Sequence, residues 1–215
     1  MSPHFLVLTP PKVAYPATSS GGLSRADQDI LWRIYYESDS IFEMGVGEST
    51  KIAAFTGVPR FTGVDGSIDW LSDVGKVSPS HYRFHWGDIG TIRDWSNPVD
   101  SASKPKWPFF STAALAAESE AFDFYLVDGR FRVASFCACL LHASLHGKDP
   151  ADFRIGMHDF ARPNYQVVLR VAKVVEGHNP HIKVNPAQIS VMRRKPEVTD
   201  SEIMAIWQEH SMVYE

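Results

Sequence analysis

The sequence is poor in cysteine and in long apolar runs. Its two cysteines, Cys137 and Cys139, lie in the segment SFCACLLHASLHG, where helical spacing turns them to different faces. We therefore expect two reduced thiols instead of a disulfide or a metal pair. No stretch approaches the roughly 20 apolar residues of a membrane-spanning helix, and residues 1–20 lack the basic leader and long apolar core of an export signal. These absences predict a cytoplasmic protein without a membrane partner.

An excess of charge of one sign is also lacking. Lys and Arg number 21 and Asp and Glu 25, which gives a formal net charge of -4. This balance offers no electrostatic reason to expect nucleic acid or an anionic membrane as the main partner. Hydrophobic residues make up 44% of the 215 residues, enough for one buried domain over 1–215 and too few for two. We expect a small-molecule ligand, and an apolar N-terminal arm and C-terminal helix that could form a homodimer.

Strand and helix patterns alternate along the chain. This alternation predicts an α/β fold: a three-layer Rossmann-like sandwich whose seven-stranded sheet is mostly parallel with a closing antiparallel strand. Residues 1–22 are expected to be an arm and 97–110, which contains three prolines, an inserted loop. The expected strands are 41–44, 60–66, 82–89, 122–129 and 152–160, with 182–185 and 189–195 as an antiparallel pair. The expected helices are 23–38, 49–55, 67–77, 111–121, 131–146, 163–177 and 199–215.

A glycine-containing turn follows the first expected strand, in SIFEMGVGEST. Gly45 and Gly47 allow a sharp turn and a close approach of a ligand to the backbone, and Ser49 brings a hydroxyl to the start of a helix. Asp65 follows at about the spacing, roughly 20 residues, at which an acid accepts the ribose hydroxyls of an adenosine ligand. The third glycine of a dinucleotide site is replaced by Thr50, and Glu43 suits a cationic ligand better than a pyrophosphate. We expect Glu43 and Asp65 to face one shared cavity.

These motifs resemble those of class I S-adenosylmethionine-dependent methyltransferases of the small-molecule type. FEMGVGEST is similar to their first motif, E-x-G-x-G-x-[ST], GVDGS to their ribose-binding acid and HWGDI to their third-strand acid. FDFYLVDGRFR is similar to their fourth strand, fDlvlvDG, and IGMHDF to their fifth, vlvHDy. The resemblance implies S-adenosylmethionine as cofactor. The cofactor-binding residues that it implies are Glu43, Gly45, Gly47, Ser49, Asp65, Gly66, Asp88 and Asp128.

The ends of the fourth and fifth expected strands would face the transferred methyl group. His158 is the candidate general base, because an imidazole with a pKa near 6.5 can accept a proton at neutral pH, and Asp128 or Asp159 could orient it. Arg130 and Arg132 could recognise a carboxylate or phosphate of the acceptor, or could equally be ion-pair partners of the two aspartates. Tyr165 is a further candidate for contact with the acceptor.

A metal-assisted mechanism is possible but not favoured. Catechol-type O-methyltransferases bind magnesium through an Asp after the fourth strand and an Asp-Asn pair after the fifth. Here Asp128 matches the first position, but His158 and Asp159 replace the pair, and histidine is a poor magnesium ligand. Asp128, His158 and Asp159 would suit zinc, iron or manganese better than magnesium, and a divalent metal is possible but not favoured.

Two functions remain open from the sequence. The first is a methyltransferase that acts on an oxygen or nitrogen of a small molecule. The alternative is a non-catalytic protein of the same fold that serves in binding or assembly, because the place of the N-P-P-Y type motif reads VDGR. An NAD-dependent oxidoreductase is disfavoured by the missing third glycine.

Overall fold

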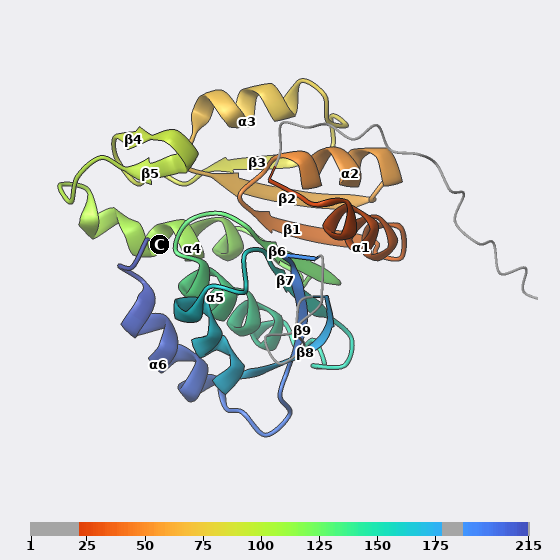
Figure 1. Ribbon diagram of the computed structural model, residues 1–215, viewed down its shortest axis with the longest axis vertical. Helices are drawn as coiled ribbons and strands as arrows, with labels where there is room; N and C mark the ends of the chain where they lie inside the picture. Colours follow the sequence, from red (N-terminus) through yellow and green to blue (C-terminus); the bar gives the residue numbers. More distant parts are fainter. Residues whose placement is uncertain (1–21, 178–186, 215) are drawn as a thin grey trace, which may run out of the picture.

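The computed structural model describes residues 22–177 and 187–214. The expected arm, apart from Gly22, and the expected strand at 182–185 therefore lie outside the described residues. Seven of the described strands form a single sheet with the order β3-β2-β1-β6-β7-β9-β8 (Figure 1). Its strands are β1 (Ser40–Met44), β2 (Arg60–Asp65), β3 (Arg83–Trp86), β6 (Phe124–Val127), β7 (Arg154–Met157), β8 (Ala172–Gly177) and β9 (Ser190–Arg194).

The sheet is parallel except at β9. Strands β3, β2, β1, β6 and β7 pair in parallel, whereas β9 pairs antiparallel with both β7 and β8. The prediction of a mostly parallel seven-stranded sheet with a closing antiparallel strand is confirmed. The order also reverses at β1, which lies between β2 and β6. In an α/β sheet, ligands bind at the carboxyl ends of the strands near such a reversal.

Helices cover both faces of the sheet, as the alternating pattern predicts. Figure 1 shows α1 and α2 on one side and α4, α5 and α6 on the other. Most of their buried apolar side chains belong to two core clusters, one for each face, and a third, smaller cluster contains Trp107 and Phe110 of α4 and Ala134 of α5. The helices are α1 (Arg25–Tyr36), α2 (Glu48–Thr56), α3 (Ile68–Gly75), α4 (Trp107–Ala116), α5 (Arg132–Leu145) and α6 (Asp200–His210).

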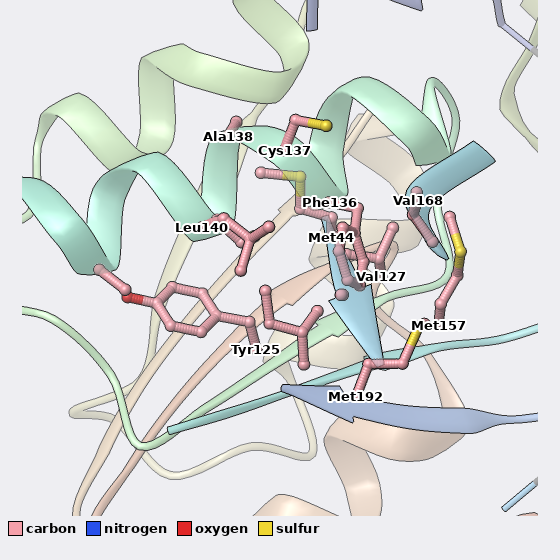
Figure 2. Close-up of a cluster of buried hydrophobic side chains, with 14 of the residues drawn as sticks. Met44, Tyr125, Val127, Phe136, Cys137, Ala138, Leu140, Met157, Val168 and Met192 are labelled. Carbon is pink, nitrogen blue, oxygen red and sulfur yellow. The ribbon is translucent and has the colours of Figure 1, made fainter. Parts of the chain in front are cut away.

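The larger core cluster lies under α5. Figure 2 shows Phe136 and Leu140 of this helix near Val127 of β6, with Met192 of β9 on the same side of the sheet. Every residue of β1 and of β6 is buried, because helices cover both faces of these central strands. Cys137 and Cys139 are free and buried in the same layer.

Two segments differ from the prediction. The helix expected at 163–177 is a 3₁₀ helix, η3 (Pro163–Arg170), followed by strand β8. The β-branched sequence VAKVVEG fits an edge strand, and pairing with β9 outweighs the local helical spacing. The loop expected at 97–110 contains strand β5 (Asn97–Pro98), a 3₁₀ helix η2 (Lys104–Lys106) and the first turn of α4. Pro108 is compatible with that turn, where backbone N–H groups have no partner within the helix.

A short hairpin connects β3 to this region. Strand β4 (Ile92–Arg93) pairs antiparallel with β5, and a 3₁₀ turn, η1 (Asp94–Ser96), joins them. Trp95 and Ser96 both adopt left-handed backbone conformations, with φ of 60° and 54°. Figure 1 places the hairpin beside β3 and α3. Among the described helices, none is both long enough and apolar enough to span a membrane.

Candidate functional site

A cavity of about 1150 Å³ lies at the carboxyl ends of the central strands. The loops after β1, β2, β6 and β7 form its wall, together with the β4–β5 hairpin and Trp70 of α3. It therefore lies at the reversal of strand order between β1 and β6, where the fold favours ligand binding. The predicted site residues that line it are Gly45, Gly47, Ser49, Asp65, Asp128, Arg130, Arg132, His158 and Asp159.

The glycine turn brings the ends of β1 and β6 close together. Gly45 has φ of 89°, and a Cβ atom added there would lie 2.5 Å from the backbone nitrogen of Gly129. The Asp128 N–H donates to the Met44 carbonyl at 2.7 Å, which fixes this approach. Only glycine fits at position 45, since a side chain would meet backbone atoms in a conformation that L residues disfavour.

Glu43 lies behind this turn and not in the cavity. Its side chain is fully buried and accepts hydrogen bonds from Tyr35 Oη at 2.6 Å and Thr50 Oγ1 at 2.5 Å. Thr50 Oγ1 in turn accepts from the Gly47 N–H at 2.9 Å. Burial raises the pKa of Glu43 to about 7, although these hydroxyl donors and Ser49 oppose the rise. The expectation that Glu43 and Asp65 face one cavity is thus wrong for Glu43, which can act on a ligand only through the loop that it holds.

Asp65 lies at the cavity wall, at the end of β2. Its Oδ1 accepts from the Ser67 N–H and from Ser96 Oγ, both at 2.9 Å. Burial raises the pKa of Asp65 against the effect of these hydrogen bonds. The carboxylate is held in place by the start of α3 on one side and by the β4–β5 hairpin on the other.

Besides Glu43, two more of the predicted cofactor residues, Gly66 and Asp88, do not line the cavity. The Asp88 carboxylate accepts from the Gly90 N–H at 2.9 Å and pairs with Lys106 Nζ at 2.5 Å, which lowers its pKa. The Gly66 carbonyl accepts from Trp86 Nε1 at 3.0 Å. Their contact with a cofactor stays a prediction that this cavity does not support.

His158 is enclosed by carboxylates. Its Nδ1 lies 3.1 Å from Asp128 Oδ1 and 3.8 Å from Asp159 Oδ1, and its Nε2 lies 3.7 Å from Asp27 Oδ2. Burial by itself lowers the pKa of His158, but the carboxylates outweigh burial and raise this pKa to about 10. The imidazole is therefore protonated at neutral pH. This charge state argues against the predicted role of His158 as a general base, because that role needs a neutral ring.

Arg132 pairs with the two aspartates, which is the second of the two roles that the sequence leaves open for it. Its guanidinium lies 3.0 Å from Asp128 Oδ1 and 3.1 Å from Asp159 Oδ2, and it donates to the His158 carbonyl at 2.7 Å. With an exposed fraction of only 4%, it is an ion-pair partner of the two aspartates. Tyr165, under the Arg132 guanidinium, is also buried and does not line the main cavity.

The three residues considered for a metal are thus bound to one another and to arginine. Among the described residues, no group of three or more His, Cys, Asp and Glu side chains is arranged to hold a metal ion. Arg132 binds both carboxylates that a metal would need.

Several residues of the site were not predicted. Asp27 fits the sequence pattern of a helix capping box, and the structure confirms that box, but its contact with His158 spans more than half of the chain. Ser96 and Asn97 reach the site from a segment that reads as a loop. Trp70 is different, because its sequence position allows either a place in the core or one along the adenine face of a cofactor. It lines the cavity, and its Nε1 donates to the Val46 carbonyl in the glycine turn.

The geometry is accompanied by likeness to solved structures. A scan against protein-family models and a search of curated proteins found no match. A methyltransferase-like protein from Silicibacter pomeroyi aligns over 91% of this chain and 97% of its own, with a TM-score of 0.66 and 21% sequence identity. The chain shares the α/β Rossmann-like fold of that methyltransferase-like protein. The resemblance in the glycine turn and the strand ends is thereby confirmed at the level of fold.

Other methyltransferase structures align less closely. The S-adenosylhomocysteine-bound methyltransferase PaMTH1 from Podospora anserina covers 80% of this chain and 79% of its own, at 12% identity and a TM-score of 0.49. The MycE methyltransferase of mycinamycin biosynthesis covers 82% of this chain and 50% of its own, at 17% identity and a TM-score of 0.40. Because both scores are below 0.5, the fold assignment depends on the first structure.

Proposed function

We propose that this protein is an S-adenosylmethionine-dependent methyltransferase that acts on an oxygen or nitrogen of a small molecule. The observation that supports this most is the meeting of the glycine turn after β1 with the Asp65 carboxylate in one cavity, at the reversal of strand order. The methyltransferase fold agrees with this function but does not by itself establish it.

The residues present fit such a cofactor. The cavity, at about 1150 Å³, exceeds the roughly 300–1,000 Å³ of ordinary ligand pockets and has room for a nucleoside and an acceptor. A Cβ added at Gly129 would lie 3.0 Å from the Gly45 nitrogen. Glycines at both positions therefore let the two strand ends approach each other at the cavity without side chains between them. Gly45, Gly47 and Ser49 would hold the amino-acid end of the cofactor, and Asp65 the ribose.

The charge state of the site limits the chemistry. S-adenosylmethionine supplies an electrophilic methyl group on a sulfonium. Because His158 is protonated and is bound to Asp128, it orients that carboxylate and does not remove a proton at neutral pH. The acceptor would therefore bring its own nucleophile, as an amine or an ionised oxygen, and the protein would contribute alignment and exclusion of water.

Calorimetric titration with S-adenosylhomocysteine tests the cofactor. We expect binding by the native protein and at least tenfold weaker binding by Asp65→Ala, because the ribose would lose a charged acceptor. Asp69→Ala is the matched control, since Asp69 is an exposed acid in the first turn of α3. No binding at millimolar concentration, or equal affinity of all three proteins, would contradict the proposal.

A non-catalytic protein of the same fold is the second candidate. It is favoured by the placement of His158 among Asp27, Asp128 and Asp159, which stabilise the protonated ring and so leave the described end of β7 without a general base. Incubation with methyl-labelled S-adenosylmethionine and a pool of small metabolites separates the two functions. Labelled product that depends on Asp65 supports the enzyme, whereas cofactor binding without product supports the binding protein.

A further inference from the structure

Arg130 differs from the other buried arginine of the site. It follows β6 and lines the cavity, and it is partly buried. Within residues 22–177 and 187–214, its guanidinium has one hydrogen bond, from Nη1 to Asn97 Oδ1 at 3.1 Å. Its Nε is buried and has no partner among these residues. A buried donor without a partner carries a cost of desolvation that a ligand could remove.

The charges of the neighbouring cluster are balanced without Arg130. Asp27, Asp128 and Asp159 face His158 and Arg132, and Arg162 also pairs with Asp159, so three carboxylates meet three cations. These six side chains form one network of ion pairs. Arg130 adds a fourth positive charge, and burial together with the charge of Arg132 lowers its pKa.

The edge of the Arg130 guanidinium that carries the unpartnered Nε is the edge at which an arginine binds a carboxylate in a bidentate manner. A guanidinium binds a carboxylate side-on through Nε and one terminal nitrogen, in two parallel hydrogen bonds. Here Nη1 is held by Asn97 of the β4–β5 hairpin, which fixes the plane of the group and leaves Nε without a hydrogen-bond partner among the described residues. Asn97 thus orients the arginine without neutralising it.

We propose that Arg130 binds a carboxylate of a ligand in this cavity. The inference rests on the proposed function, because the two sources of that carboxylate are the acceptor and the amino-acid end of the cofactor. Both offer the same chemistry, and they can be separated by experiment.

The test uses pairs of probes that differ in one carboxylate. S-adenosylhomocysteine is compared with its decarboxylated analogue, and benzoate with benzamide in the presence of saturating S-adenosylhomocysteine. Each is titrated calorimetrically into the native protein, Arg130→Gln and Arg130→Lys. Arg162→Gln is the matched control, because this arginine lines the same cavity but already pairs with Asp159.

We expect Arg130→Gln to lower the affinity for one carboxylate probe by roughly 10- to 100-fold and to leave the affinity for its counterpart without the carboxylate unchanged. Arg130→Lys should keep part of the affinity, since it retains the charge and loses the fork. An effect on S-adenosylhomocysteine identifies the cofactor as the source, and an effect on benzoate identifies the acceptor. The inference is overturned if the native protein prefers neither carboxylate, or if Arg162→Gln has the same effect as Arg130→Gln.

Failure of the proposed function gives a different result. If the native protein binds no S-adenosylhomocysteine, benzoate and benzamide are titrated into the protein alone. Tighter binding of benzoate than of benzamide that is lost in Arg130→Gln would then support an anion site at Arg130 and reject S-adenosylmethionine as the cofactor. No such preference would reject both.

Discussion

Asp27 contacts three separate parts of the molecule. It caps α1 through Ser24, its Oδ1 accepts from the backbone N–H groups of Gln188 and Ile189 at 2.8 and 2.7 Å, and its Oδ2 faces His158. Its side chain is fully buried. One carboxylate therefore joins the first helix, the approach to β9 and the end of β7, so the position of His158 depends on segments that are far from it in the sequence.

His158→Gln should destabilise the protein in a pH-dependent manner. The folded pKa of His158, about 10, lies above its ordinary value of 6.5, so its contribution is fully present below pH 6.5 and is lost as pH rises through 10. At pH 6 we expect a loss of about 3–5 kcal/mol in the free energy of unfolding, because the buried Asp27 carboxylate loses its cation and Asp128 keeps only Arg132. Urea unfolding at pH 6, 8 and 10 measures this. Equal losses at all three values would contradict the assigned charge state.

Glu43 and Thr50 should act as a unit in cofactor binding. If Glu43 works only through the Thr50 hydroxyl, then Glu43→Gln and Thr50→Val will each raise the Kd of S-adenosylhomocysteine, and the double variant will be little worse than either. The coupling should be about 0.5–3 kcal/mol.

Tyr35→Phe is the control for this cycle, because it removes a hydrogen bond to the other Glu43 oxygen without touching the glycine turn. It should lower stability and leave the Kd unchanged. Strictly additive effects of Glu43→Gln and Thr50→Val would instead indicate that Glu43 contacts the ligand itself.

The sequence predicts the location of a site residue where that residue directly follows a buried strand. Gly45 and Asp65 stand directly after buried strands, so a parallel sheet brings them to the same edge. The charge of His158 could not be predicted in this way. It is set by Asp128, Asp27 and Asp159 together. The sequence separates Asp27 from His158 by more than half of the chain, and a local pattern carries no information on that contact.

At the scale of elements, the β1–α2 turn is the least tolerant part of the site. Gly45→Ala should cost more than the roughly 1–2 kcal/mol of a left-handed L residue, because its Cβ would also meet the backbone of Gly129. Gly57→Ala measures the cost of the left-handed conformation alone, since Gly57 has φ of 75° with no atom within 4 Å of an added Cβ. Urea unfolding of both variants gives the comparison. A Gly45→Ala protein as stable as Gly57→Ala would show that the strand ends can separate without cost.

Elements were predicted well where pattern and pairing agree and poorly where they compete. The buried runs of β1 and β6 and the amphipathic α1 follow from periodicity alone. Residues 172–177 follow a helical spacing but pair with β9, and a pairing partner that comes later in the chain is invisible to a local pattern. The β4–β5 hairpin was missed because each of its strands is only two residues long.

For the whole molecule, ligand binding should appear as thermal stabilisation. S-adenosylhomocysteine at 100 times its Kd adds about 2.7 kcal/mol to the folded state. For a chain of this length that corresponds to a rise in Tm of roughly 5–10 °C. Differential scanning fluorimetry measures the rise, and Asp65→Ala with a tenfold higher Kd should gain only about 1.4 kcal/mol at the same ligand concentration, which is roughly half of the native rise. An equal rise in both proteins would place the ligand elsewhere.

The position of β9 has a consequence for biosynthesis. Both of its sheet neighbours, β7 and β8, precede it in the chain, so the ribosome delivers them before the strand that joins them. At about 5–20 residues per second, the nascent chain carries unpaired strand edges on the order of seconds. Until Ser190–Arg194 emerge, β8 lacks the strand that pairs it into the described sheet, and its edge is exposed for that interval.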